Sequence, residues 1–208
     1  MTVAALRPRT RIEDLRRGEL IAAAHRVFME HGLSGLTTAR ICAAAGMSPG
    51  ILSYYFEGKD EVLYAVVRLN NRALVQDVVV RLRRARTRRE RLYAIIEGNF
   101  PADFYERNVA NAWLSVCAAS ARNERFARLQ RLFHARLASN LASVFDDVVS
   151  PELQGNLILS IGAQIDGLWL RKSTDQGLDR ATAVTVILRS VDAQLDPEAL
   201  ARLQDPIR

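Results

Sequence analysis

The chain has 208 residues, of which 49% are hydrophobic, and it carries a net charge of +6. This hydrophobic content supports a substantial core and excludes an intrinsically disordered protein. No apolar run is long enough to span a membrane and the N-terminus lacks the core of a signal peptide, so we expect a cytoplasmic protein without membrane contact. The few prolines and glycines fall at expected helix ends, which favours an all-α fold.

The positive charge lies mainly in the N-terminal part. Residues 1–91 hold 17 Lys and Arg against 9 Asp and Glu, whereas residues 92–208 hold 12 against 14. Such a basic part is typical of a nucleic-acid-binding domain. Cys42, Cys117 and three scattered histidines have no metal-ligand spacing. We therefore expect buried thiols, no metal site and no cofactor.

Residues 1–11 form a basic segment with arginines at alternate positions, Arg7, Arg9 and Arg11. This segment is either an arm that reaches the DNA backbone or minor groove, or a solvated terminus. From about Ile12 to His31 apolar residues recur at helical spacing, and Gly32 ends the run. We expect this helix to brace the two helices that follow it.

The first of those two helices has a hydroxyl N-cap candidate in Thr37 and directs Ile41, Ala44 and Ala45 inward. Gly46 ends it, because glycine adopts the left-handed conformation without a Cβ clash.

A second short helix is expected directly after this turn. Ser48 would cap it and Pro49 would occupy its first position, where no N–H is needed. Leu52 and Phe56 would form its buried face. Two short helices around a glycine turn predict a helix-turn-helix DNA-binding unit.

The run S-P-G-I-L-S-Y-Y-F-E-G-K at residues 48–59 resembles the signature of TetR-type repressors. The matching positions are Ser48, Gly50, Leu52, Tyr55, Phe56 and Lys59, preceded by Thr37, Thr38, Ala45 and Gly46. Most of the family has tyrosine where this chain has Ser53, and serine there is similar to the BetI-like branch, the choline-responsive repressors.

The resemblance implies that the second helix lies in the major groove of double-stranded operator DNA. Phosphate contacts are expected from Thr38, Tyr54, Tyr55 and Lys59, and base contacts from Pro49, Gly50, Ile51 and Ser53. Arg40 would add a base or phosphate contact, and Thr37 and Ser48 complete the predicted DNA-binding set. In ordinary helix-turn-helix dimers the two half-sites of a palindrome lie about 34 Å apart.

A long helix from Asp60 to about Arg86 is expected to be a rigid rod between two domains, residues 1–58 and residues 59–208. The arginines of residues 81–91 are interpreted as a mostly solvated face and loop, with a phosphate contact as the alternative. Further helices are expected over residues 88–100, 108–121, 123–149, 151–173 and 179–195. No catalytic constellation stands out, so we expect no enzyme.

Two segments resemble the BetI-type C-terminal domain: Gly98–Phe100 followed by Ala112–Leu114, and Ile165–Arg171. The resemblance implies a ligand pocket among the middle helices and a homodimer formed by the last two long helices. These helices are apolar around much of their circumference, which favours burial by a partner copy over a single-chain core.

For a quaternary ammonium ligand, such as choline, the candidate aromatic walls are Phe100, Tyr105, Trp113 and Trp169. Asp166 is the candidate counter-charge. The alternatives are tryptophans that belong to the core, and an Asp166 that pairs with Arg171 or across the dimer interface.

The sequence therefore predicts an all-α, ligand-responsive repressor with a three-helix DNA-binding domain, a long connecting helix and a larger ligand-binding and dimerisation domain. One alternative is a TetR-type regulator of another pathway, such as efflux or catabolism, with an apolar or aromatic ligand. The others are a helical enzyme and a ligand-binding dimer without DNA binding.

Overall fold

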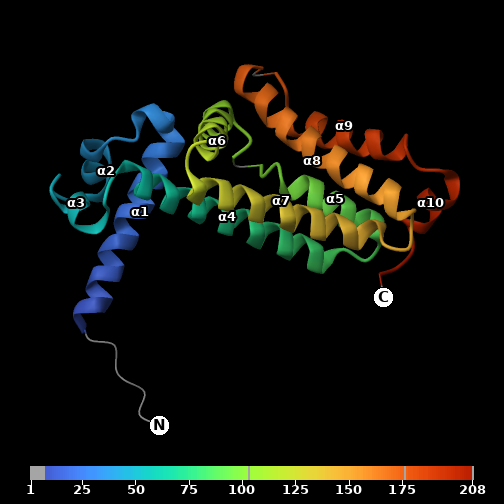
Figure 1. The fold of residues 1–208 in the computed structure, drawn as a ribbon, viewed down its shortest axis with the longest axis horizontal. Coiled ribbons are helices and arrows are strands. Elements are labelled where there is room, and N and C mark those ends of the chain that lie inside the picture. The colour runs from blue at the N-terminus through green and yellow to red at the C-terminus, as the bar shows by residue number, and fades with distance from the viewer. Residues whose placement is uncertain (1–7, 103, 176, 208) are drawn as a thin grey trace, which may run out of the picture. The chain divides into compact units, whose positions relative to one another are not determined.

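A computed structural model describes residues 8–102, 104–175 and 177–207. These residues form ten α-helices and no β-strand, apart from an isolated bridge between Thr87 and Pro206 (Figure 1). None of the described helices is long and apolar enough to cross a membrane. The chain divides into two compact units, Met1–Leu69 and Asn70–Arg208. The division falls within α4 (Lys59–Arg84), whereas the sequence places the domain boundary ahead of this helix.

The first unit contains α1 (Pro8–Gly35), α2 (Thr38–Ala45), α3 (Ile51–Tyr55) and the start of α4. α1 is longer than the predicted brace at both ends. Gly32, with φ of +65°, interrupts the helix where the sequence analysis expected its end. The backbone is helical from Pro8, so the tail expected over residues 1–11 is helical in its last residues, and Arg7 lies outside the described residues.

Every helix of the first unit contributes buried apolar side chains. The buried residues are Leu20, Ala23, Ala24, Val27, Phe28, Leu36, Ile41, Cys42, Leu52, Phe56, Val62, Leu63, Val66 and Val67. Ala44, which the sequence predicted to point inward, is exposed. Of the two thiols expected to be buried, Cys42 is buried and Cys117, in the second unit, is half-buried. Because α2 turns Ile41 and Cys42 toward the core, Ala44 lies on the outer side, where its carbonyl accepts from Arg26 at 2.8 Å.

The second unit begins with the rest of α4. It continues with α5 (Arg88–Gly98), α6 (Arg107–Ser120), α7 (Glu124–Phe145), α8 (Pro151–Thr174), α9 (Arg180–Asp192) and α10 (Pro197–Arg202). α8 packs against α6, α7 and α9, and α5 packs against α7 and α9. The predicted helices are found within a few residues of their expected bounds, and Asn123 caps α7 as expected. Among the helices in the described part of this unit, α10 is the one that was not predicted.

The predicted solvated arginine face at residues 81–91 is wrong for several of its members. Arg88 donates to the carbonyl oxygens of Val144 and Asp146, at 3.0 and 2.6 Å, and Arg89 pairs with Asp192. A guanidinium carries five donors, so these arginines can fasten α5 to the ends of α7 and α9. Periodicity identifies exposed positions on a helix but not the carbonyl groups that a long side chain can reach.

Candidate DNA-binding surface and effector site

The turn between α2 and α3 begins as the sequence predicts. The Thr37 hydroxyl accepts from the Arg40 N–H at 3.3 Å, so Thr37 is the N-cap of α2. Gly46 has φ of +65° and ψ of +32°, the left-handed conformation that ends the helix. This geometry favours glycine, because a Cβ at positive φ would clash with the backbone.

The predicted cap of the second helix is wrong. α3 starts at Ile51 with Gly50 in the N-cap position and no side-chain cap. The Ile51 N–H is bonded to the carbonyl of Ser48 at 3.1 Å, so Ser48 acts through its backbone and its side chain stays exposed. The thiol of Cys42 donates to the Pro49 carbonyl at 3.7 Å and ties this turn to α2. Because both of these bonds use backbone carbonyls, the Ser48 hydroxyl takes part in neither.

Nine of the eleven predicted DNA-binding residues are exposed, and the other two, Ile51 and Tyr55, are half-buried. Leu52 and Phe56 lie beneath them in the core. The exposed residues are Thr37, Thr38, Arg40, Ser48, Pro49, Gly50, Ser53, Tyr54 and Lys59. The set thus occupies exposed or half-buried positions in α2 and its N-cap, the turn after it, α3 and the first residue of α4.

Three side chains of α1 and α3 support this surface, and sequence reasoning did not single out the two from α1. The Arg17 guanidinium lies 4.6 Å from the centre of the Phe56 ring and pairs with Glu61 at 3.0 Å, which fastens α1 to the start of α4. The Tyr54 hydroxyl donates to Glu13 at 3.3 Å. A phosphate contact from Tyr54 would therefore replace a carboxylate contact within the protein.

In the second unit three of the five predicted ligand residues form one buried aromatic cluster. Ring centres are 5.3 Å apart for Phe100 and Tyr105, 5.0 Å for Tyr105 and Trp169, and 6.1 Å for Phe100 and Trp169. The Trp169 indole N–H donates to the carbonyl of Asn99 at 3.1 Å. The cluster therefore joins α8 to the segment that follows α5.

Lys172 adds a cation to this cluster, and sequence reasoning gave it no role. Its ammonium lies 5.3 Å from the centre of the Tyr105 ring and donates to the carbonyl of Leu178 at 2.9 Å. The Tyr105 hydroxyl is buried and finds no hydrogen-bond partner among the described residues. Burial raises the pKa of Tyr105 to about 12, and the charges of Asp179 and Asp175 add to the rise.

Trp113 and Asp166, the other two predicted ligand residues, lie outside this aromatic cluster. The Trp113 ring packs against Phe133 with centres 5.7 Å apart. Asp166 pairs with His134 of α7 at 3.5 Å, and not with Arg171 as one alternative had it. Burial raises the pKa of the Asp166 carboxyl although His134 lowers it. Asp166 is thus the partner of His134.

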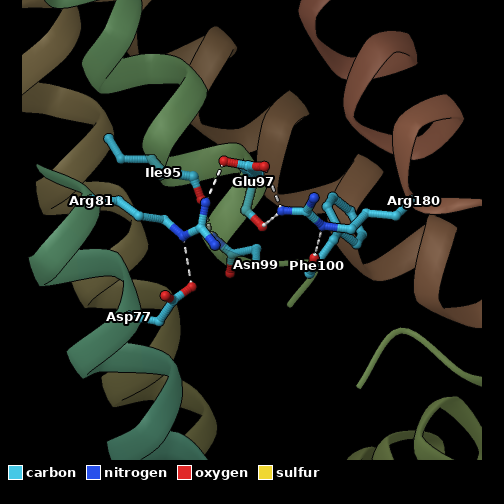
Figure 2. Close-up of polar contacts among 7 residues, drawn as sticks. All are labelled: Asp77, Arg81, Ile95, Glu97, Asn99, Phe100 and Arg180. Carbon is cyan, nitrogen blue, oxygen red and sulfur yellow. Dashed lines mark hydrogen bonds and ion pairs between the residues drawn. The ribbon is translucent and has the colours of Figure 1, made fainter. Parts of the chain in front are cut away.

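Glu97 at the end of α5 lies between two arginines (Figure 2). Its carboxylate pairs with Arg180 of α9 at 2.7 Å and with Arg81 of α4, and Arg81 also donates to Asp77 at 2.7 Å. Arg180 donates in turn to the carbonyl of Phe100. We call these four charged residues the Glu97 clamp. It connects α4 with the backbone of the aromatic cluster.

Gly98 lets α4 and α5 approach each other beside the clamp. A Cβ built on Gly98 would lie 2.6 Å from a methyl carbon of Val78, which is closer than carbon atoms pack. A larger residue fits here only if the Val78 side chain or one of the two helices shifts.

Two protein families match this chain by their sequence models. "Bacterial regulatory proteins, tetR family" covers residues 20–66, and "BetI-type transcriptional repressor, C-terminal" covers residues 88–196. The second match spans more than half of the chain. The chain belongs to the TetR family, with a BetI-type C-terminal domain. It is a transcriptional repressor of this type, and the matching families consist of regulators and not of enzymes.

Relatives of known name agree with this assignment. The chain is 37% identical over 180 residues to the HTH-type transcriptional regulator BetI of Brucella anthropi, which covers 86% of this chain and 92% of that protein. It is also 37% identical to the HTH-type transcriptional regulator BetI 2 of Chromohalobacter salexigens, over 85% of this chain and 86% of that protein.

Solved structures show the same fold at lower identity. A transcriptional regulator from Saccharomonospora viridis in complex with choline has a TM-score of 0.73 at 20% identity, and covers 85% of this chain and 95% of its own. A transcriptional regulator from Pseudomonas aeruginosa PAO1 has a TM-score of 0.71 at 22% identity, and the match covers 91% of this chain and 94% of that chain. The all-α fold predicted from the sequence is thereby confirmed.

Proposed function

We propose that this repressor is a homodimer that binds a palindromic operator and leaves it when a quaternary ammonium compound, such as choline, binds the second unit. The observation that carries the proposal is the buried aromatic cluster of Phe100, Tyr105 and Trp169, which already holds an ammonium group at one ring face. Ring faces attract cations, including quaternary ammonium groups. The relatives named BetI and the choline complex of a structural neighbour support the same ligand class.

The homodimer is supported by apolar side chains on the outside of α8 and α9. Leu159 is 74% exposed, Leu170 54% and Val186 46%, although both helices also contribute to the core. A helix that is apolar on both its inner and its outer side needs a second partner. A second copy would cover these side chains with two-fold symmetry, and a two-fold protein matches a palindromic operator.

The DNA contacts are proposed from the exposed face of α2, α3 and the intervening turn. Lys59, Thr38 and the two tyrosines would hold phosphates, which fixes the position of the protein without reading sequence. Ser53 and Ile51 offer one hydroxyl and one apolar group to base edges. Such a repressor would act in the cytoplasm, where its operator lies.

The Glu97 clamp is the proposed route from ligand to DNA. Phe100 contributes its ring to the aromatic cluster and its carbonyl to Arg180, while Glu97 joins Arg180 to Arg81 of α4. A ligand that rearranges the cluster would change the clamp and hence the direction of α4, which continues into the first unit. The ligand must bind the two arrangements with different affinity, or it changes nothing.

Operator binding tests the proposal directly. Fluorescence anisotropy of labelled DNA from upstream of the protein's own gene would be followed at several salt concentrations and then titrated with choline and betaine aldehyde. We expect tight, salt-sensitive binding that either compound reverses. Tight binding that neither compound disturbs would support the DNA-binding part of the proposal and reject the ligand class.

A further inference from the structure

We propose that Lys172 is a built-in competitor of the effector. Its ammonium occupies the cation position of the aromatic cluster, and a quaternary ammonium effector binds by displacing it. This inference rests on the proposed function and adds to it the residue that sets the effector's affinity.

The distances give the cluster one cation position that Lys172 already fills. Its ammonium lies 5.3 Å from the centre of the Tyr105 ring, within the roughly 6 Å over which a ring face attracts a cation. The three rings stand 5.0–6.1 Å apart, so they pack against one another and leave no space between them for a second cation. Like charges also repel, so Lys172 and the effector's ammonium cannot share this ring face.

The lysine is held in place, but by contacts that it can exchange. Only 9% of Lys172 is exposed, and a buried charge is costly unless it is paired. The carbonyl of Leu178 accepts its hydrogen bond at 2.9 Å, and its charge helps to lower the pKa of the exposed Asp179. A long, flexible side chain can swing its ammonium from a ring face toward such a carboxylate and toward water. When an effector displaces the Lys172 ammonium, its positive charge therefore moves toward the turn between α8 and α9.

Tyr105 supplies an independent reason to expect a ligand here. The ring whose face holds Lys172 also carries a buried hydroxyl that has no partner among the described residues. Buried polar groups are normally hydrogen-bonded, and the described residues offer this hydroxyl no acceptor, so it can donate to a bound molecule. A small molecule with a quaternary ammonium and a nearby acceptor oxygen would satisfy both features of this ring. The class includes choline and betaine aldehyde.

Isothermal titration calorimetry on the full-length protein would test this inference with choline and tetramethylammonium as ligands. We expect Lys172→Met, which keeps the apolar chain and removes the charge, to bind both compounds about 10-fold more tightly than the unaltered protein. Lys172→Gln serves as a second variant if methionine disturbs folding, which circular dichroism would report. Arg171→Met is the matched control, because it removes the neighbouring positive charge from the exposed side of α8.

A Tyr105→Phe variant separates the hydroxyl from the ring. It should weaken choline binding several-fold and leave tetramethylammonium, which has no oxygen, unchanged. Equal loss for the two compounds would reject the part assigned to the hydroxyl.

The outcomes separate this inference from the proposed function. If the unaltered protein binds choline and the Lys172 variants bind it equally or more weakly, the competitor role is wrong and the ligand class stands. An increase that Arg171→Met reproduces would also reject it, because general charge would then be the cause. If no variant binds either compound while the operator is still bound, both the competitor role and the ligand class are wrong.

Discussion

The two units of this repressor place their candidate binding residues in opposite environments. In the first unit nearly all of them are exposed, on a surface supported by buried Leu52 and Phe56. In the second, Phe100, Tyr105 and Trp169 are themselves part of the core. Apart from the helix cap Thr37, a side chain on the first surface can therefore change binding with little change in stability, whereas in the aromatic cluster the two properties are linked. The following substitutions test this difference.

The largest effects are expected from removing one core ring in each unit. Phe56→Ala and Phe100→Ala should each lower the free energy of unfolding by about 3–5 kcal/mol, because each leaves a cavity. If the units are independent, Phe56→Ala abolishes operator binding and keeps choline binding, whereas Phe100→Ala abolishes the choline response. Urea unfolding followed by circular dichroism, together with both binding assays, would measure this. Loss of choline binding in Phe56→Ala would contradict the independence of the two cores.

Glu97→Gln should have the next largest effect, because it leaves Arg81 and Arg180 without their shared carboxylate. We expect a loss of about 1–3 kcal/mol in stability and a weaker release of operator by choline. The control is Glu124→Gln, since the pair of Glu124 with Arg131 is exposed and such pairs contribute about 0–1 kcal/mol. Normal release by choline in Glu97→Gln would exclude the clamp as the route.

Gly98→Ala tests the close approach of α4 and α5. The added methyl group meets Val78, so we expect a loss of about 1–3 kcal/mol. In the first unit Gly18→Ala has no neighbour within 4 Å of the new Cβ, and in a helix it should gain about 0.5–1 kcal/mol. Thermal unfolding of the two variants should thus shift in opposite directions. Equal shifts would mean that the contact with Val78 is relieved without cost.

The smallest effect distinguishes the two hydroxyl residues that the sequence offered as helix caps. Thr37→Ala should cost about 1 kcal/mol, because it removes the cap of α2. Ser48→Ala should cost almost nothing in stability, because only the backbone carbonyl of Ser48 is used. If chemical denaturation shows equal losses, Ser48 caps α3 after all. Any effect of Ser48→Ala on operator affinity would be a separate, surface effect.

Much of the first unit could be predicted from the sequence because its signals are local. Thr37 and Gly46 sit where a cap and a left-handed residue must be, and both predictions are confirmed. The cap prediction for Ser48 was wrong because a serine can accept a hydrogen bond in a turn either through its side-chain hydroxyl or through its backbone carbonyl. Residue type does not decide between the two oxygens. The short α3 then begins at Ile51.

The candidate effector site was harder to predict because its residues are far apart in the chain. Phe100, Tyr105 and Trp169 were named as a set from aromatic type and family resemblance, but nothing local indicates that Trp113 packs elsewhere, against Phe133. Lys172 follows Trp169 by one turn of α8, which could have suggested a cation near that ring. The partners of Glu97 lie 16 and 83 residues away, and no periodicity predicts such pairs.

Reciprocal binding tests the central claim, that the buried effector site and the exposed DNA-binding surface are coupled. Choline would be titrated calorimetrically into the protein alone and into its saturated operator complex. We expect weaker choline binding to the complex, by the same factor by which saturating choline weakens operator binding, because coupling between two sites is reciprocal. Equal choline affinity with and without operator would show that the two sites are not coupled.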